Sequence, residues 1–167
     1  MKMKYKRIRI YIFLSIVILI VANFIFSYFF TRPVQVQHVF QSGISVKDNN
    51  ITDDNINIDL NGYIKNTDFK LSKLAICKDL TGTITINDKQ YSLNLVNFGS
   101  ATDNLFWGAL TEIGSSPKSK PSYIAYITSD LSTIYLSQDT EKYHIAAPAK
   151  TIDDYNQISH NMNGIKN

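Results

Sequence analysis

The chain has a single cysteine among its 167 residues, Cys77, and therefore cannot form an internal disulfide. No cysteine lies near the end of the N-terminal apolar run, so lipid attachment through a cysteine is not indicated there. Short catalytic signatures are missing as well, because the sequence contains no G-x-S-x-G, P-loop, G-x-G-x-x-G or H-E-x-x-H motif. These absences exclude a disulfide-built fold and any enzyme class that such a motif would reveal.

Acidic residues are absent from the first 32 residues, which contain six Lys/Arg. Five of these cations precede an uncharged run of 21 residues, Ile10 to Phe30. A helix of that length extends roughly 30 Å, the thickness of the hydrocarbon core of a bilayer. Because basic residues stay on the cytoplasmic side, the pattern predicts a cytoplasmic tail at 1–9, a transmembrane helix at 10–30 and a C-terminal domain outside the cell membrane.

The same run must be compared with a cleavable signal, which has an apolar stretch of about 7–15 residues followed by small residues. Here the run is longer and ends in the bulky stretch "FSYFFTRP". Ala22, with Ile20 two positions before it, is a poor cleavage site. We therefore expect an uncleaved signal anchor that contacts the lipid bilayer through Ile10 to Phe30. Cleavage would instead give a secreted soluble factor.

The remaining 135 residues contain 11 Lys/Arg and 14 Asp/Glu, a formal charge of −3. They show no basic stripe, so no nucleic-acid partner is expected. This length is enough for one domain with its own core.

Alternating apolar and polar residues predict a mainly β domain, a β-rich α+β fold, at 56–167. We interpret 31–55 as a stalk or first strand followed by a polar loop at 42–55. Residues 67–82 fit either a helix or an irregular strand, and strand is favoured. The expected architecture is an antiparallel sheet or a small sandwich covered by a C-terminal helix. Strands are expected at 56–60, on both sides of a hairpin turn at Asn87-Asp88-Lys89, at 123–128, at 132–137 and before Pro148.

A C-terminal helix is predicted from a capping pattern in "TIDDYNQISHNM". Thr151 would cap the helix, and Asp154 three residues later would complete a capping box with Asp in place of Glu. The residues expected to pack on the sheet are Ile152, Tyr155, Ile158 and Met162.

A weak calcium candidate consists of Asn57, Asp59, Asn61 and Asp68, whose spacing resembles a calcium-binding loop. Asn at the first position, Asp at the twelfth and the cation Lys65 at the ninth all weaken it. A strand with polar residues facing water, followed by a turn at Asn61-Gly62, is the favoured interpretation. We expect no metal and no cofactor.

Cys77 and His144 are the groups with possible chemistry, since a reactive thiol needs a lowered pKa and a nearby base. No spacing brings them together, and the histidines His38, His144 and His160 lack metal-ligand spacing. A buried structural cysteine is favoured. His144 alternates with Tyr143 and Ile145 and so faces away from them. No catalytic residue is assigned.

Phe106, Trp107 and Tyr126 form a possible interaction surface, because Tyr and Trp are common binding anchors. They are also ordinary β-core residues, and a buried Trp107 is the favoured expectation. A strong anchor without a catalytic signature predicts a non-enzymatic, single-pass membrane protein. Its outer domain would bind a protein partner or another envelope component, or act as an accessory subunit. The alternative is a membrane-tethered enzyme that acts on envelope material through Cys77, His144 or dispersed acids.

Overall fold

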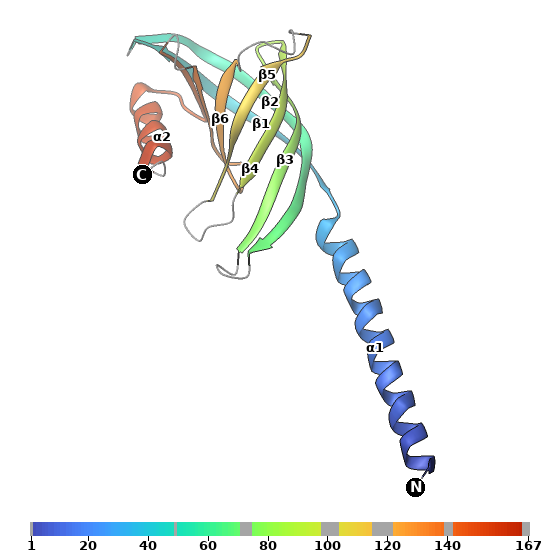
Figure 1. Cartoon of the computed structure of the whole chain (residues 1–167). Helices are drawn as coiled ribbons and strands as arrows, with labels where there is room; N and C mark the ends of the chain where they lie inside the picture. The colour runs from blue at the N-terminus through green and yellow to red at the C-terminus, as the bar shows by residue number, and fades with distance from the viewer. Residues whose placement is uncertain are drawn as a thin grey trace. The chain divides into compact units, whose positions relative to one another are not determined.

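The computed structural model describes residues 2–48, 50–70, 75–97, 104–114, 122–138 and 142–164. The chain divides into two compact units, Met1–Arg32 and Pro33–Asn167. The first is the helix α1 (Lys2–Thr31), and the second contains the strands and the helix α2 (Ile152–Gly164) (Figure 1). The strands are β1 (Val34–Lys47), β2 (Asn50–Lys70), β3 (Ala75–Ile86), β4 (Lys89–Asn97), β5 (Leu105–Glu112), β6 (Tyr123–Thr128), β7 (Ile134–Gln138) and β8 (Tyr143–Ala147).

Helix α1 is long and apolar enough to cross a membrane over Ile10–Thr31. None of this stretch is buried inside the protein, so it is not a core helix. A signal sequence near an N-terminus would meet the same criterion of length and composition. The helix predicted at 10–30 is confirmed as a helix.

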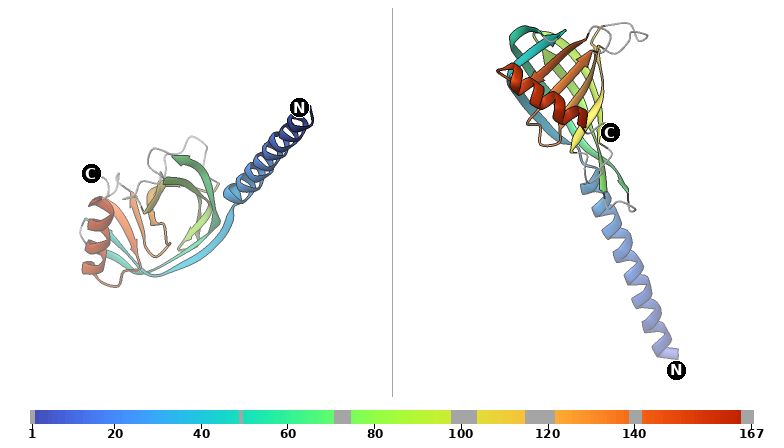
Figure 2. Two further views of the ribbon diagram at one scale, coloured as in Figure 1. Left: turned by 90° about the horizontal axis from the view of Figure 1, so that it is seen from below. Right: turned by 90° about the vertical axis from the view of Figure 1, so that its left-hand side faces the viewer.

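The eight strands form a closed antiparallel barrel in which each strand pairs with the next (Figure 2). The barrel closes where Ile44–Lys47 of β1 pair with Tyr143–Ala146 of β8. Closure satisfies the backbone groups that an open sheet would leave at its edges. Antiparallel pairing and a covering C-terminal helix were predicted correctly, whereas the predicted open sheet or sandwich is replaced by a barrel. The two ends of the barrel are named by the direction of the strands. Odd-numbered strands begin at the proximal end, and even-numbered strands begin at the distal end.

Alternation along the strands fills the barrel interior with apolar side chains. Ile56, Ile58 and Leu60 of β2 are buried, while Asn57 and Asp59 between them are exposed, as predicted. An eight-stranded barrel is just wide enough for its own side chains to fill it. The buried interior residues are Phe40, Ile56, Ile58, Leu60, Leu80, Ile84, Ile86, Tyr91, Leu93, Leu95, Phe106, Leu110, Ala125, Ile127, Ile134, Leu136, Ile145 and Ala147.

The first strand expected after residue 31 is confirmed as β1, whereas the alternative of a stalk and the polar loop predicted at 42–55 are wrong, because β1 and β2 cover most of 31–55. The β1–β2 register shifts between Phe40 and Val46, which breaks the alternation that identifies a strand. Polar side chains also pair across the strands, as the Ser45 and Thr52 hydroxyls lie 2.8 Å apart. A polar sequence is therefore compatible with a strand here.

The predicted turn at Asn61-Gly62 is also wrong, since β2 runs through both residues. Gly62 lies directly opposite Gly82 of β3. A Cβ on Gly62 would overlap the carbonyl oxygen of Thr81, so this glycine permits a close strand approach rather than a turn. The extended conformation favoured for 67–82 is confirmed for the described residues, but they belong to two paired strands, the end of β2 and the start of β3, rather than to one irregular strand. Residues 71–74 of this segment lie outside the described residues.

The hairpin turn between β3 and β4 is confirmed. Asn87 and Asp88 have φ angles of 43° and 69°, and Ile86 pairs with Lys89. Two residues with positive φ are typical of a type I′ turn, whose twist matches that of the strands. The strand predicted at 123–128 is confirmed as β6, β7 begins two residues later than expected, and β8 ends before Pro148.

Helix α2 packs against the outside of the barrel, and the predicted capping box is confirmed. The backbone N–H of Asp154 donates to Oγ1 of Thr151 at 3.2 Å, and the N–H of Thr151 donates to Oδ2 of Asp154 at 3.0 Å. The side chains of Tyr155 and Met162 are buried against β1, β5, β7 and β8 residues. This second core contains Ile44, Val46, Leu105, Tyr135, Ala146, Ala149, Tyr155 and Met162, with Tyr126, Ile152 and Ile158 partly buried beside it.

Candidate functional site

The outer face of β5 carries the only tryptophan of the chain, Trp107. Its side chain is 45% exposed, so the favoured expectation that it is buried is wrong. Phe106 is fully buried in the barrel interior, because neighbouring residues of a strand point to opposite faces. Because Phe106 and Trp107 are both large and aromatic, the sequence alone does not indicate which of the two side chains faces the barrel interior. Phe106 therefore does not belong to the surface that was expected to include it.

Trp107 pairs across the strands with Val96 of β4 and Tyr126 of β6. Val96 and Tyr126 are half-buried, and we call these three residues the Trp107 surface. Tyr126 in turn pairs with Tyr135, whose ring centroid is 6.2 Å away, and Tyr135 lies 6.3 Å from Tyr155 of α2. The aromatic row thus begins exposed on β5 and ends beneath α2. A rigid, exposed aromatic side chain such as that of Trp107 is suited to contact with another molecule.

The outer face of β2 and β3 has a different character. Asn57, Asp59 and Asn61 are exposed on it, and Thr81 and Thr83 are exposed on the neighbouring strand. In an extended strand, alternate residues lie about 6.6 Å apart, so the three candidate calcium ligands of β2 do not converge on one point. The side chain of Asp68 lies outside the described residues. Among the residues that the structure describes, no group of three His, Cys, Asp or Glu side chains is placed to hold a metal.

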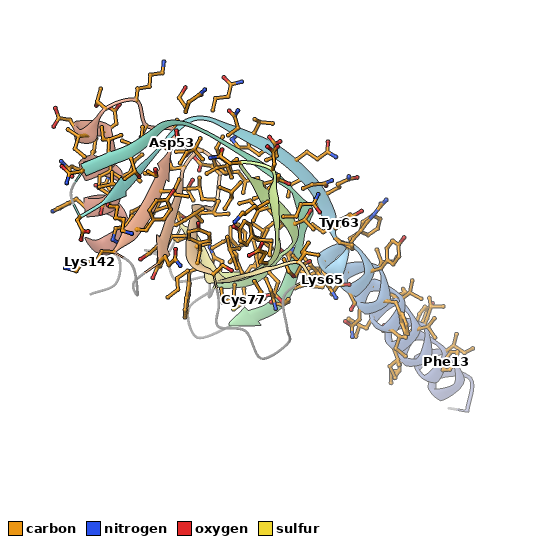
Figure 3. The ribbon with its side chains drawn as sticks, turned by 90° about the horizontal axis from the view of Figure 1, so that it is seen from above. Phe13, Asp53, Tyr63, Lys65, Cys77 and Lys142 are labelled. Atoms are coloured by element: carbon orange, nitrogen blue, oxygen red, sulfur yellow. The ribbon has the colours of Figure 1, made fainter. Side chains whose placement is uncertain are left out.

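Cys77 is buried on β3, as predicted for a structural cysteine (Figure 3). His144 lies on β8 opposite Val46 and Ser137, and its ring stacks on Tyr135 with centroids 5.8 Å apart. Its predicted orientation away from Ile145 is confirmed, since Ile145 belongs to the interior. In the closed barrel β1 and β2 lie between β8 and β3, so Cys77 and His144 are not neighbours.

The two remaining histidines also lie apart. His38 packs its ring against Phe40 at a centroid distance of 4.5 Å, and His160 is exposed on α2.

A tyrosine cluster at the distal end of the barrel was missed by sequence reasoning. Tyr91, Tyr123 and Tyr143 lie on β4, β6 and β8, with ring centroids 5.5 Å apart for the first pair and 6.5 Å for the second. Burial, and then the charge of Glu112, raise the pKa of Tyr91 above its ordinary value. Each tyrosine follows the inward alternation of its strand, but only closure of the barrel brings the three together.

The proximal end of the barrel carries a polar group of interior positions on adjacent strands. Lys78 of β3 pairs with Asn66 of β2 on one side and with Asn97 of β4 on the other. Asn97 is buried, while Asn66 and Lys78 are half-buried. These residues form a polar boundary to the apolar interior, and Leu80 and Leu95 follow them inward.

Comparison with known proteins gives no relative of this chain. No protein-family model, no curated protein and no solved structure matches it. The Trp107 surface therefore rests on its own geometry: the only tryptophan of the chain lies on an outward face, at the margin of the region that α2 covers.

Proposed function

We propose that this chain is a single-pass membrane protein in which α1 stays in the bilayer as an uncleaved signal anchor. The N-terminus lies in the cytoplasm and the barrel lies outside. Support comes from the uncharged stretch Ile10–Phe30, from the five cations before it and from the absence of burial along α1. The barrel has its own core and a closed sheet, as expected of a domain that folds as a separate unit.

The barrel acts as a binding or accessory module of the cell envelope, and the Trp107 surface is its contact surface. The observation that carries this proposal is the 45% exposure of Trp107 beside Val96 and Tyr126. A large aromatic side chain on an outward strand face is costly to leave in water and is typical of binding anchors. No catalytic role is proposed.

The anchor is tested by expressing the full chain with a C-terminal tag and measuring the mass of the tagged product after cell fractionation. We expect the full-length mass in the membrane fraction, with the tag accessible to external protease. A shortened product in the medium would show that the N-terminal segment is cleaved and that the protein is a secreted factor. A tag protected from protease would contradict the orientation.

The contact surface is tested by placing a photo-crosslinking amino acid at position 107 in cells. A matched control carries the same amino acid at Thr83, which is exposed on the polar face of β3. We expect adducts from position 107 and none, or far fewer, from position 83. Equal labelling from both positions would contradict a specific contact at the Trp107 surface.

A further inference from the structure

We infer that the proximal part of β1, Val34–Gln41, is an interface at which a second copy of this chain adds its own β1 in the antiparallel direction. Two barrels would then share one continuous sheet. This inference goes beyond the proposed function, because it uses neither the anchor nor the Trp107 surface. It is carried by three observations: the unpaired side of β1, the absence of charge along it, and the match of the segment to itself.

Closure of the barrel uses only the distal part of β1. Residues Val34–Phe40 pair with β2 on one side. On the other side β8 pairs only with Ile44–Lys47, and after β8 the N–H of Ala149 donates to the carbonyl oxygen of Ser42 at 2.7 Å. Within the part of the chain that the structure describes, no strand pairs with Val34–Gln41 on this side. We call Val34–Gln41 the free edge. Its backbone N–H and C=O groups that point away from β2 are open to a further strand.

The free edge contains no Lys, Arg, Asp or Glu, and valine and phenylalanine, which favour strands, make up half of it. Natural proteins usually protect an unpaired edge with charged residues, because these oppose the addition of another strand. Both ends of β2 follow this rule. Residues 50–56 pair with β1 and not β3, residues 65–70 pair with β3 and not β1, and these segments carry Asp53 and Lys65 (Figure 3). The free edge lacks this protection and therefore favours pairing.

The free edge also matches itself. When the two-fold axis passes through Gln37, Val34 of one copy lies opposite Phe40 of the other. In the same register Val36 lies opposite His38. These four residues share the face of β1 that Phe40 turns to the barrel interior, so interior-facing side chains meet one another across the two copies. The uncharged Gln37 faces its own copy, where a charged residue would be repelled by itself.

A second copy is favoured over a flexible peptide, because its edge is already a strand. A peptide must be ordered on binding, which costs about 1–2 kcal/mol of backbone entropy per residue. In β1 the pairing with β2 already holds the extended conformation. Val34 and Val39 are 62% and 54% exposed, and an added strand would cover part of their apolar surface.

The test uses a cysteine at the centre of the inferred pair. In the full chain, Cys77→Ser removes the only native thiol and Gln37→Cys provides a new one, which faces its own copy across the two-fold axis. We expect mild oxidation of the purified chain in detergent micelles to give a disulfide-linked product of twice the chain mass. The matched control, Cys77→Ser with Asn55→Cys, places the thiol on an exposed residue of the acidic end of β2 and should give far less of this product. Circular dichroism checks that each variant keeps its strand content.

A second measurement does not depend on oxidation. We expect Gln37→Lys and Gln37→Glu each to raise the dissociation constant of the dimer, measured by sedimentation, by about fivefold, because like charges then face each other across the strands. An equal mixture of the two variants should restore the dimer, since opposite charges then meet. Asn55→Lys is the matched control and should leave the dissociation constant unchanged.

Three outcomes would overturn the inference. The first is a monomer in sedimentation with no crosslink at position 37. The second is a dimer that persists in Gln37→Lys and does not crosslink at position 37, because the two copies then associate elsewhere. The third is a disulfide that forms in cells between position 37 and a different protein, because the free edge then serves another partner.

Discussion

The glycine at position 82 allows two strands of the barrel to approach more closely than side chains permit. Its φ of 153° and the overlap that a Cβ would make with the carbonyl oxygen of Asn61 both disfavour any other residue. We expect Gly82→Ala to lower the free energy of unfolding by at least about 2 kcal/mol, because strain and overpacking each cost about 1–3 kcal/mol. Urea denaturation followed by circular dichroism measures this loss. Thr83→Ala, at the exposed neighbouring position, should change stability much less, and equal losses would show that the close approach is not the cause.

Ionisation of the Tyr155 hydroxyl makes the stability of the contact between α2 and the barrel depend on pH in the alkaline range. Burial, and then the neighbouring Tyr135, raise the pKa of Tyr155 above its ordinary value of about 10. The folded state therefore favours the neutral phenol. Its contribution to stability is fully present below pH 10 and is lost as the pH rises towards the folded-state pKa.

We expect the free energy of unfolding to fall above pH 10 and to fall less steeply in Tyr155→Phe, as measured by urea denaturation at a series of pH values. Tyr91, whose pKa is also raised by burial, should leave part of the slope in place. An unchanged slope in Tyr155→Phe would assign the whole effect to other groups.

Among the features of single helices and strands, the capping box fixes the residue at which α2 begins. We expect Thr151→Ala to cost about 1 kcal/mol of unfolding free energy, as is typical for the loss of a capping hydroxyl, and Thr151→Ser to restore it.

The hydrogen bonds from Lys150 and Thr151 hold the pKa of Asp154 below its ordinary value. This carboxylate stabilises the folded state above its ordinary pKa, and the stabilisation is lost as the pH falls through the folded-state value. Thr151→Ala should therefore also make the free energy of unfolding depend less on pH in the acidic range. If Thr151→Ser lowers the free energy of unfolding as much as Thr151→Ala does, the proposed role of the hydroxyl is contradicted.

Local signals were enough to predict the elements that depend on neighbouring residues. The turn at Asn87-Asp88 and the cap at Thr151 are set by backbone preferences within a few residues, and both are present in the structure. The strand residues within 42–55, at the end of β1 and the start of β2, were missed because bulges in β1 interrupt its alternation and because the exposed face is polar. The exposure of Trp107 was missed because Phe106 and Trp107 are both large, and only the position of β5 in the sheet decides which one faces inward.

At the scale of the whole molecule, closure of the barrel could not be predicted from the sequence. It depends on pairing between Ile44–Lys47 and Tyr143–Ala146, segments about 100 residues apart, and no local pattern specifies that contact. The tyrosine cluster follows from closure, because it combines residues from strands that are distant in the chain. The sequence suggested Phe106, Trp107 and Tyr126 as a surface and favoured a buried Trp107, so neither the burial of Phe106 nor the exposure of Trp107 was predicted.

The compact unit Pro33–Asn167 should fold without the preceding helix, and α2 should be a substantial part of its stability. Tyr155 and Met162 are both more than 90% buried against the barrel, and burial of each such side chain contributes about 1.5–3 kcal/mol. We expect residues 33–167 to unfold in urea in a single transition, and residues 33–150 to lose at least about 3 kcal/mol and to bind a hydrophobic dye through the uncovered face. Met162→Ala within 33–167 is an intermediate control and should cost about 2 kcal/mol or more. Equal midpoints for the two fragments would show that α2 adds little to the stability of the barrel. An unfolded 33–167 would show that the barrel needs the membrane anchor in order to fold.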